Sequence, residues 1–113
     1  MLAAATWSGD LIFWPSIPVD YTGLQNLQVQ QQKTPGPILG LCWQEDAPAL
    51  LIAHSDNSIM KWDLQSNQLS VIGKHDGPVK DIASFTNQGT SIVVSAGWDA
   101  KVKFWTWQGP TQL

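Results

Sequence analysis

The sequence predicts an all-β fold in which one unit of antiparallel strands is repeated. A nine-residue cassette that ends in tryptophan occurs three times, at 6–14, 54–62 and 97–105. The closing residues Trp14, Trp62 and Trp105 are 48 and 43 positions apart. Because the blade of a β-propeller repeats about every 40–45 residues, this spacing predicts part of a propeller.

The strands of each unit can be placed from the apolar pattern. Runs at 50–53 and 92–95 precede runs at 59–62 and 102–105, and turn-forming residues join them, as in β-hairpins. Alternating segments at 38–43 and 79–85 predict the strand before each hairpin. More polar segments at 27–30 and 68–72 predict an exposed outermost strand, and segments 44–48 and 86–90 predict loops.

These elements divide the chain into about two and a half four-stranded antiparallel blades. We expect a half blade at 1–32, a full blade at 33–72 and a nearly full blade at 73–113, together forming a single partial propeller. Propellers close with roughly 4–8 blades. The sequence therefore predicts a chain that cannot close a ring by itself.

Composition excludes several classes of function. The chain of 113 residues is 43% hydrophobic and 13% charged, as expected for a globular protein. Its net charge is −3, with six lysines and no arginine, so we expect no direct contact with nucleic acid. The chain has neither an apolar run of about 18 residues nor a basic segment at its start, which predicts a soluble intracellular protein without membrane contact.

Residues with reactive side chains do not form a catalytic pattern. Cys42 lies in an apolar stretch, which predicts a buried and unreactive thiol. His54 and Asp56 stand two apart on a turn, but no third metal ligand accompanies them. We therefore predict no enzymatic activity, no catalytic residue, no cofactor and no metal site.

The last unit carries a family signature. Gly73-Lys74-His75, followed by Asp99 and Trp105, resembles the glycine-histidine and tryptophan-aspartate elements of WD40 repeats. The resemblance implies a buried structural tetrad of His75, Ser95, Asp99 and Trp105 that fixes the blade, because each polar group would find a partner. In the preceding unit Thr34 and Ile52 replace the histidine and the hydroxyl, so we expect that blade to be less rigidly tied.

Longer segments resemble one WD40 subfamily. The segments 61–68, 75–80 and 97–105 are similar to the poly(A)+ RNA export factors of the nuclear pore. This implies a non-enzymatic scaffold in mRNA export that binds a short acidic motif of an FG nucleoporin or a checkpoint kinase. It also implies a location in the nucleus, at the nuclear pore and in the cytoplasm. The alternatives are a spindle-checkpoint WD40 scaffold and a truncated propeller fragment without independent activity.

Three residues are candidates for partner binding. Trp7 and Trp98 lie at or near the turns of their hairpins, and Lys101 follows the second turn. An aromatic side chain beside a cation suits an acidic peptide with an apolar anchor, whereas local packing is the competing interpretation. An incomplete propeller also leaves two blade faces exposed, which predicts self-association.

Overall fold

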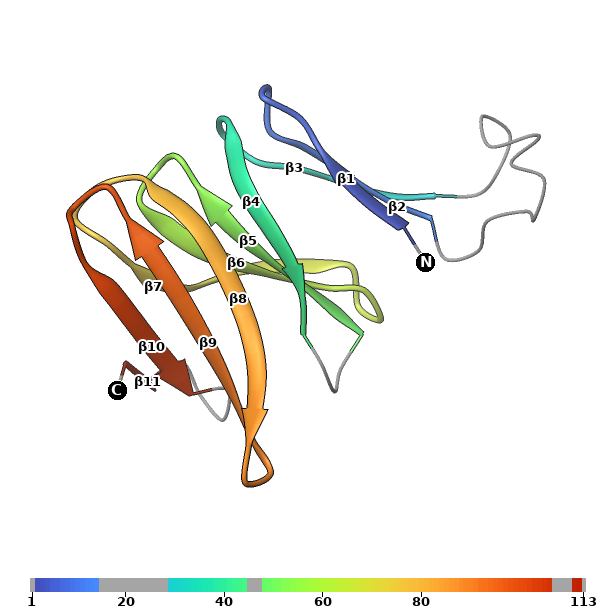
Figure 1. Cartoon of the computed structure of the whole chain (residues 1–113). Helices are drawn as coiled ribbons and strands as arrows, with labels where there is room; N and C mark the ends of the chain where they lie inside the picture. Colours follow the sequence, from blue (N-terminus) through green and yellow to red (C-terminus); the bar gives the residue numbers. More distant parts are fainter. Residues whose placement is uncertain (1, 15–28, 45–47, 107–110, 113) are drawn as a thin grey trace.

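The strands of the chain form three separate antiparallel sheets (Figure 1). The structure is a computed structural model, and it describes residues 2–14, 29–44, 48–106 and 111–112. The first sheet has the order β1-β2-β3, with β1 at Leu2–Ala5, β2 at Asp10–Trp14 and β3 at Gln30–Lys33. Within these described ranges no helix is long and apolar enough to cross a membrane.

The second and third sheets have four strands each. The second sheet has the order β4-β5-β6-β7, formed by Ile38–Trp43, Ala49–His54, Ser58–Asp63 and Gln68–Lys74. The third has the order β11-β10-β9-β8, and its strands in chain order are Val79–Asn87, Thr90–Gly97, Val102–Thr106 and Thr111–Gln112. The predicted all-β fold of unclosed antiparallel blades is confirmed.

Most observed strands extend one or two residues beyond the predicted runs, and two regions differ in kind. The outermost strand of the first sheet, expected at 27–30, begins only at Gln30, and residues 27 and 28 lie outside the described residues. The expected loop at 86–90 is a two-residue hairpin turn, because Gln88 and Gly89 both adopt positive φ angles of 51° and 80°. Such a turn matches the twist of paired strands and lets β8 and β9 continue up to it.

The sheets stack side by side in chain order, and a core fills each of the two spaces between them (Figure 1). Side chains alternate between the two faces of a strand, so neighbouring residues of β5 enter different cores. Leu50 and Ile52 pack toward the first sheet, whereas Leu51 and Ala53 pack toward the third. The second sheet is therefore covered on both faces, and all six residues of β5 are buried.

The closing tryptophans of the cassettes join one sheet to the sheet before it. Trp62 packs with Leu11 and Phe13 of the first sheet, and Trp105 lies in the core shared with the second sheet. The Trp105 ring leaves no space for a side chain at position 73, where a Cβ atom would come within 2.6 Å of it. Burying an aromatic side chain of this size contributes about 1.5–3 kcal/mol, so these contacts are a main source of cohesion between sheets.

Candidate functional site

The same tight turn closes the hairpin of all three cassettes. At the equivalent position of each turn the residue has a positive φ: 95° at Gly9, 76° at Asn57 and 65° at Ala100. Glycine and asparagine adopt this conformation readily, whereas alanine does so at a cost of about 1–2 kcal/mol. The turns are thus built alike although their sequences differ, and all three lie at the same end of the stack (Figure 1).

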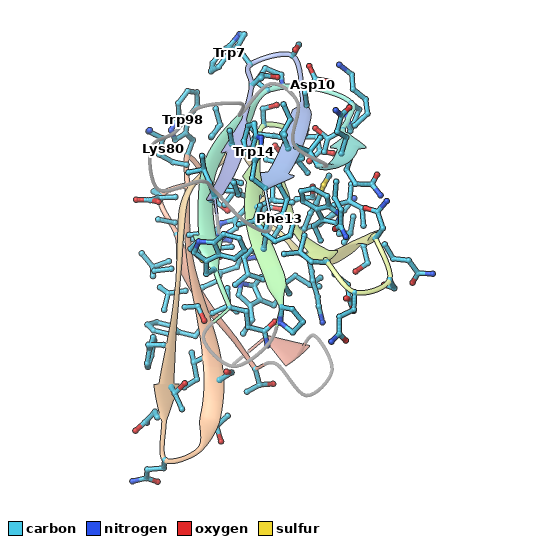
Figure 2. All side chains as sticks on the ribbon, turned by 90° about the vertical axis from the view of Figure 1, so that its right-hand side faces the viewer. Trp7, Asp10, Phe13, Trp14, Lys80 and Trp98 are labelled. Carbon is cyan, nitrogen blue, oxygen red and sulfur yellow. The ribbon has the colours of Figure 1, made fainter. Side chains whose placement is uncertain are left out.

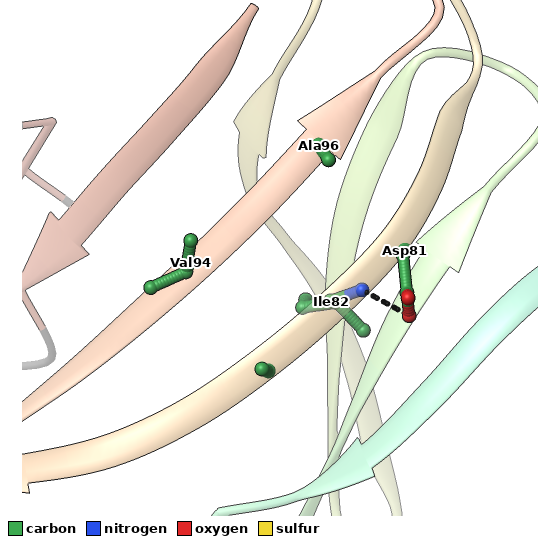
Figure 3. A pocket seen from close by; sticks show the side chains of 5 residues that line it. Asp81, Ile82, Val94 and Ala96 are labelled. Carbon is green, nitrogen blue, oxygen red and sulfur yellow. Dashed lines mark hydrogen bonds between the residues drawn. The ribbon is translucent and has the colours of Figure 1, made fainter.

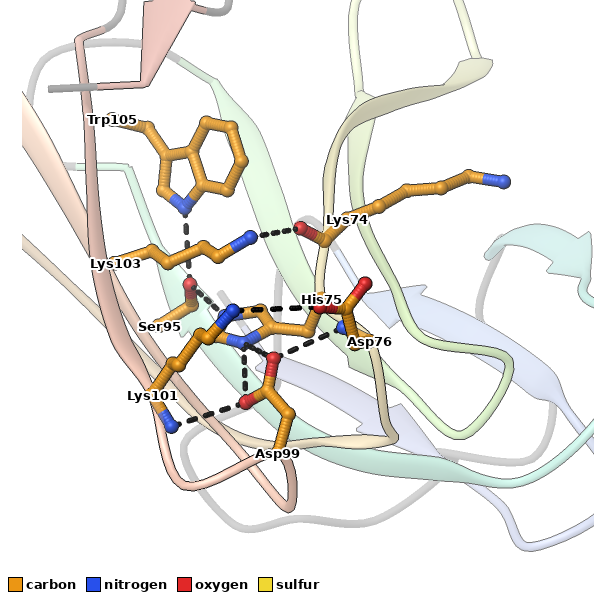
Figure 4. A network of polar contacts seen from close by, with 8 residues as sticks. All are labelled: Lys74, His75, Asp76, Ser95, Asp99, Lys101, Lys103 and Trp105. Atoms are coloured by element: carbon orange, nitrogen blue, oxygen red, sulfur yellow. Dashed lines mark hydrogen bonds and ion pairs between the residues drawn. The ribbon is translucent and has the colours of Figure 1, made fainter.

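In the third sheet the four residues of the expected tetrad lie in contact (Figure 4). His75 Nδ1 is 3.0 Å from Asp99 Oδ1, and His75 Nε2 is 2.8 Å from Ser95 Oγ. Trp105 Nε1 donates to Ser95 Oγ at 3.0 Å. A carboxylate only accepts hydrogen bonds, so Nδ1 carries the imidazole hydrogen and Nε2 accepts from the serine hydroxyl.

Asp99 is the centre of these contacts because it also holds the backbone of its own turn. Its carboxylate accepts hydrogen bonds from the backbone N–H groups of Asp76 and Lys101, at 3.0 and 3.1 Å. Burial alone would raise the pKa of Asp99, but these bonds and the one from His75 outweigh it and hold the pKa at about 2. The carboxylate is therefore ionised throughout the physiological range.

The second sheet contains a different polar network at the same place. His54 is fully buried, and its Nε2 is 2.8 Å from the hydroxyl of Thr34. The Thr34 hydroxyl in turn donates to the carbonyl of Gly9 at 3.0 Å, which ties the second sheet to the turn of the first. Asp56 donates its N–H to His54 Nδ1 and accepts hydrogen bonds from Ser58. The blade that was expected to be less rigidly tied thus has a buried polar network of its own.

The two networks differ because the buried imidazole comes from different segments. In the third sheet it belongs to the segment before the first strand, and in the second sheet it belongs to the end of the second strand. When the closing tryptophans are aligned, His54 stands at the position of Gly97. When Gly36-Pro37 is aligned with Gly77-Pro78, Thr34 stands at the position of His75. A Cβ atom at Gly97 would lie 2.5 Å from His75 Nδ1, so one site has room for only one imidazole. In this blade the indole of Trp62 donates instead to Asn67 at 2.8 Å. The sequence signal for this network was His54 at the start of the second cassette, where the third cassette has Gly97.

Both candidate tryptophans are strongly exposed at the end of the stack that bears the turns (Figure 2). Trp7 is 73% exposed and Trp98 is 68% exposed, and they occupy the same position in the first and third cassettes. Lys80 lies beside Trp98 in this view. Lys101 Nζ is 3.4 Å from the carboxylate of Asp76, and both side chains remain largely exposed.

The backbone beneath each exposed tryptophan is held by hydrogen bonds. Trp98 donates its N–H to the carbonyl of Pro78 at 2.9 Å, and Asp99 anchors the rest of that turn. Below Trp7, the Thr6 hydroxyl accepts the N–H of Asp10 at 3.0 Å, and Ser8 donates to the Asp10 carboxylate at 2.9 Å. Lys33 pairs with the same carboxylate at 3.0 Å. The rings therefore stand on turns whose backbone is held by several hydrogen bonds.

A hollow on the third sheet and the thiol of Cys42 are further features of the described residues. A shallow hollow on the third sheet is lined by Asp81, Ile82, Ala83, Val94 and Ala96, and its one carboxylate already accepts the N–H of Ile82 at 2.8 Å (Figure 3). Burial, with a smaller effect of Asp81, raises the pKa of Cys42 to about 12, so its thiol stays protonated. No cluster of three potential metal ligands occurs in the described ranges.

Comparison with known proteins shows which family and which relatives the chain resembles. The WD40 family, described as WD domain, G-beta repeat, matches residues 66–106, which contain the His75–Asp99–Trp105 contacts. The chain contains a WD40 repeat. It is similar to the mRNA export factor rae-1 of Caenorhabditis elegans, with 33% identity over 93% of this chain, and to Protein Rae1 of Drosophila melanogaster, with 28% identity over 99%.

Solved structures show the same fold. The crystal structure of the RRP9 WD40 repeats matches 98% of this chain with a TM-score of 0.75 and 19% identity. The β-propeller domain of Cps50 (Swd1) from Myceliophteria thermophila matches with a TM-score of 0.71 and 16% identity. The chain spans 27% and 31% of the lengths of the worm and fly relatives, and about a third of each of these propellers.

Proposed function

We propose that this WD40-repeat protein is a non-enzymatic scaffold in mRNA export that binds a short acidic motif of a partner protein. The observation that carries the proposal is the pair of exposed tryptophans, Trp7 and Trp98, at equivalent turns of one end of the stack. Large aromatic side chains on an ordered backbone are typical anchors of protein interfaces. The relatives named mRNA export factors support the cellular process.

The chemistry around Trp98 supports an acidic partner. Lys80 follows Pro78, whose carbonyl accepts the N–H of Trp98, and Lys101 follows Trp98 in the same turn. The Lys101 side chain is more than half exposed although its amine faces Asp76. An acidic segment would gain charge contacts with these lysines while an apolar residue packs on the indole. Exposed charges of this kind mainly raise the association rate and add modest affinity, so the indole carries most of the binding energy.

The experiment is a calorimetric titration of a glutamate-rich nucleoporin-type peptide with one apolar anchor against the protein and its Trp98→Ala variant. We expect the variant to bind about tenfold or more weakly, because an aromatic anchor is lost, while its melting temperature is unchanged. Phe85→Ala is the control. Phe85 is 38% exposed, but it lies near the last residue of β8, whereas the Trp98 turn lies beside the first. Equal affinities of wild type and Trp98→Ala would assign Trp98 to local packing only.

The proposed role also predicts where in the cell the protein is located. A scaffold in mRNA export acts at the nuclear pore and exchanges between nucleus and cytoplasm. A fluorescently tagged chain should therefore accumulate at the nuclear envelope. A uniform cytoplasmic signal would contradict this part of the proposal.

A further inference from the structure

The turn of the first cassette lacks the carboxylate that holds the turn of the third. When the cassettes are aligned on their closing tryptophans, Ser8 stands at the position of Asp99. The Ser8 hydroxyl bonds to side chains of its own hairpin, at 3.0 Å from Thr6 Oγ1 and 2.9 Å from the Asp10 carboxylate. These bonds shape the turn that carries Trp7, but they do not attach it to a neighbouring segment.

The turn is attached through the carbonyl of Gly9 to the segment between β3 and β4. This oxygen accepts the backbone N–H of Thr34 at 2.8 Å and the Thr34 hydroxyl at 3.0 Å. The backbone bond recurs in the next blade, where His75 donates its N–H to the carbonyl of Asn57 at 2.8 Å, but there an imidazole replaces the hydroxyl. A Cβ atom at Gly9 would lie 2.8 Å from the Thr34 hydroxyl oxygen, so the turn and the threonine are in close contact.

His54 determines the direction in which the Thr34 hydroxyl donates. The hydroxyl has one hydrogen, and the carbonyls of Gly9 and Gly36, at 3.0 and 3.1 Å, can only accept it. His54 Nε2, which is 2.8 Å from the same hydroxyl oxygen, is therefore the donor of that bond. In agreement, His54 Nδ1 accepts the N–H of Asp56 at 3.0 Å. The hydroxyl cannot turn away from this arrangement without leaving a buried imidazole N–H unpaired.

We propose that Thr34 and His54 are positioning residues for Trp7 in the partner-binding surface, an inference that rests on the proposed function. Because Trp7 is 73% exposed, the backbone of its turn determines where the indole stands. The ion pair of Lys33 with Asp10 also joins β3 to this hairpin, but both side chains are exposed, so the pair contributes little. The buried chain of hydrogen bonds that starts at His54 therefore keeps the turn in one place.

The experiment is a calorimetric titration of the acidic peptide against Thr34→Val, which loses the hydroxyl but keeps the shape of the side chain, and against Thr34→Ser, which keeps the hydroxyl. We expect Thr34→Val to bind about threefold or more weakly and Thr34→Ser to bind as the wild type does. In a Trp7→Ala background, Thr34→Val should cause no further loss of affinity, because it acts through the indole. Val93→Ala is the control, since Val93 is buried in the other core and its truncation lowers stability without touching the turn.

Two measurements without the peptide test the chain of hydrogen bonds itself. The nitrogen chemical shifts of the two imidazoles should show the hydrogen of His54 on Nε2 and that of His75 on Nδ1. The N–H of Gly9 donates to the carbonyl of Thr6 at 3.1 Å. Its amide exchange should be about tenfold faster in Thr34→Val than in the wild type and in Thr34→Ser, because the turn opens more often.

The outcomes separate this inference from the proposed function. A hydrogen on Nδ1 of His54, donated to the Asp56 carboxylate 3.0 Å away, would overturn the chain of bonds. Unchanged amide exchange in Thr34→Val, or an equal loss of affinity in the Trp7→Ala background, would overturn the positioning role. A wild type that does not bind the peptide but has the expected shifts and exchange would contradict the proposed function alone. If Thr34→Val unfolds, the double variant with His54→Phe replaces it, because both polar partners are then removed together.

Discussion

At the scale of single residues, Asp99 determines the conformation of the turn on which Trp98 stands. Its carboxylate meets one imidazole and two backbone N–H groups, and each of these donors needs an acceptor in a partly buried place. The same carboxylate orients His75. The other ring nitrogen of His75 bonds to Ser95, whose hydroxyl oxygen also accepts the indole N–H of Trp105. The turn that carries the exposed Trp98 and the buried Trp105 are thus connected through the carboxylate of Asp99.

The low pKa of Asp99 predicts how stability depends on pH. The folded-state pKa of about 2 lies below the ordinary value of 3.8, so ionised Asp99 stabilises the folded chain fully above about pH 4. This contribution is lost as the pH falls through the folded pKa. Melting temperatures measured from pH 7 to pH 2 should decline less steeply below pH 4 for Asp99→Asn than for the wild type. Parallel declines would mean that Asp99 has the same pKa in both states.

At the scale of the hairpin, the second and third sheets each bury one imidazole that bonds to a hydroxyl, but the histidine comes from different segments in the two sheets. In the third sheet His75 comes from the segment before β8 and Gly97 leaves room for it. In the second sheet His54 comes from the end of β5 and meets Thr34 in the segment before β4. Either arrangement connects two segments that are about 20 residues apart in the sequence.

This symmetry predicts similar costs for removing either histidine. His54→Ala and His75→Ala should each lower the free energy of unfolding by about 1–3 kcal/mol, because each leaves buried hydroxyl or backbone groups without a partner. Urea denaturation measures both values, with Val71→Ala as a surface control. A negligible effect at His54 and a large one at His75 would show that only the third sheet depends on its imidazole.

Much of the architecture could be predicted at this scale, because strands with regular alternation and cassettes with a closing tryptophan leave a strong pattern. The strand Ile38–Trp43 was predicted with its observed bounds. The hairpin at Gln88 and Gly89 could not be placed, because a glutamine in the left-handed region is uncommon and depends on the pairing of β8 with β9. The role of His54 was missed because its partner Thr34 lies 20 residues away and forms no part of a recurring motif.

At the scale of the whole molecule, three sheets share two cores and present two kinds of surface. The sheets pack on one another through faces that bear the two cores, whereas the turn end exposes Trp7 and Trp98. The division explains how one residue type serves two purposes in this chain. Trp62 and Trp105 at the ends of their cassettes hold sheets together, whereas Trp7 and Trp98 in the turns are exposed.

The most direct test of this account is the affinity of the acidic peptide for a variant that lacks both turn tryptophans. If Trp7 and Trp98 form one binding surface, the Trp7→Ala and Trp98→Ala double variant should bind more weakly than either single variant, and its melting temperature should equal that of the wild type. A double variant that binds the peptide as tightly as the wild type would contradict the assignment of the turn end as the interaction surface.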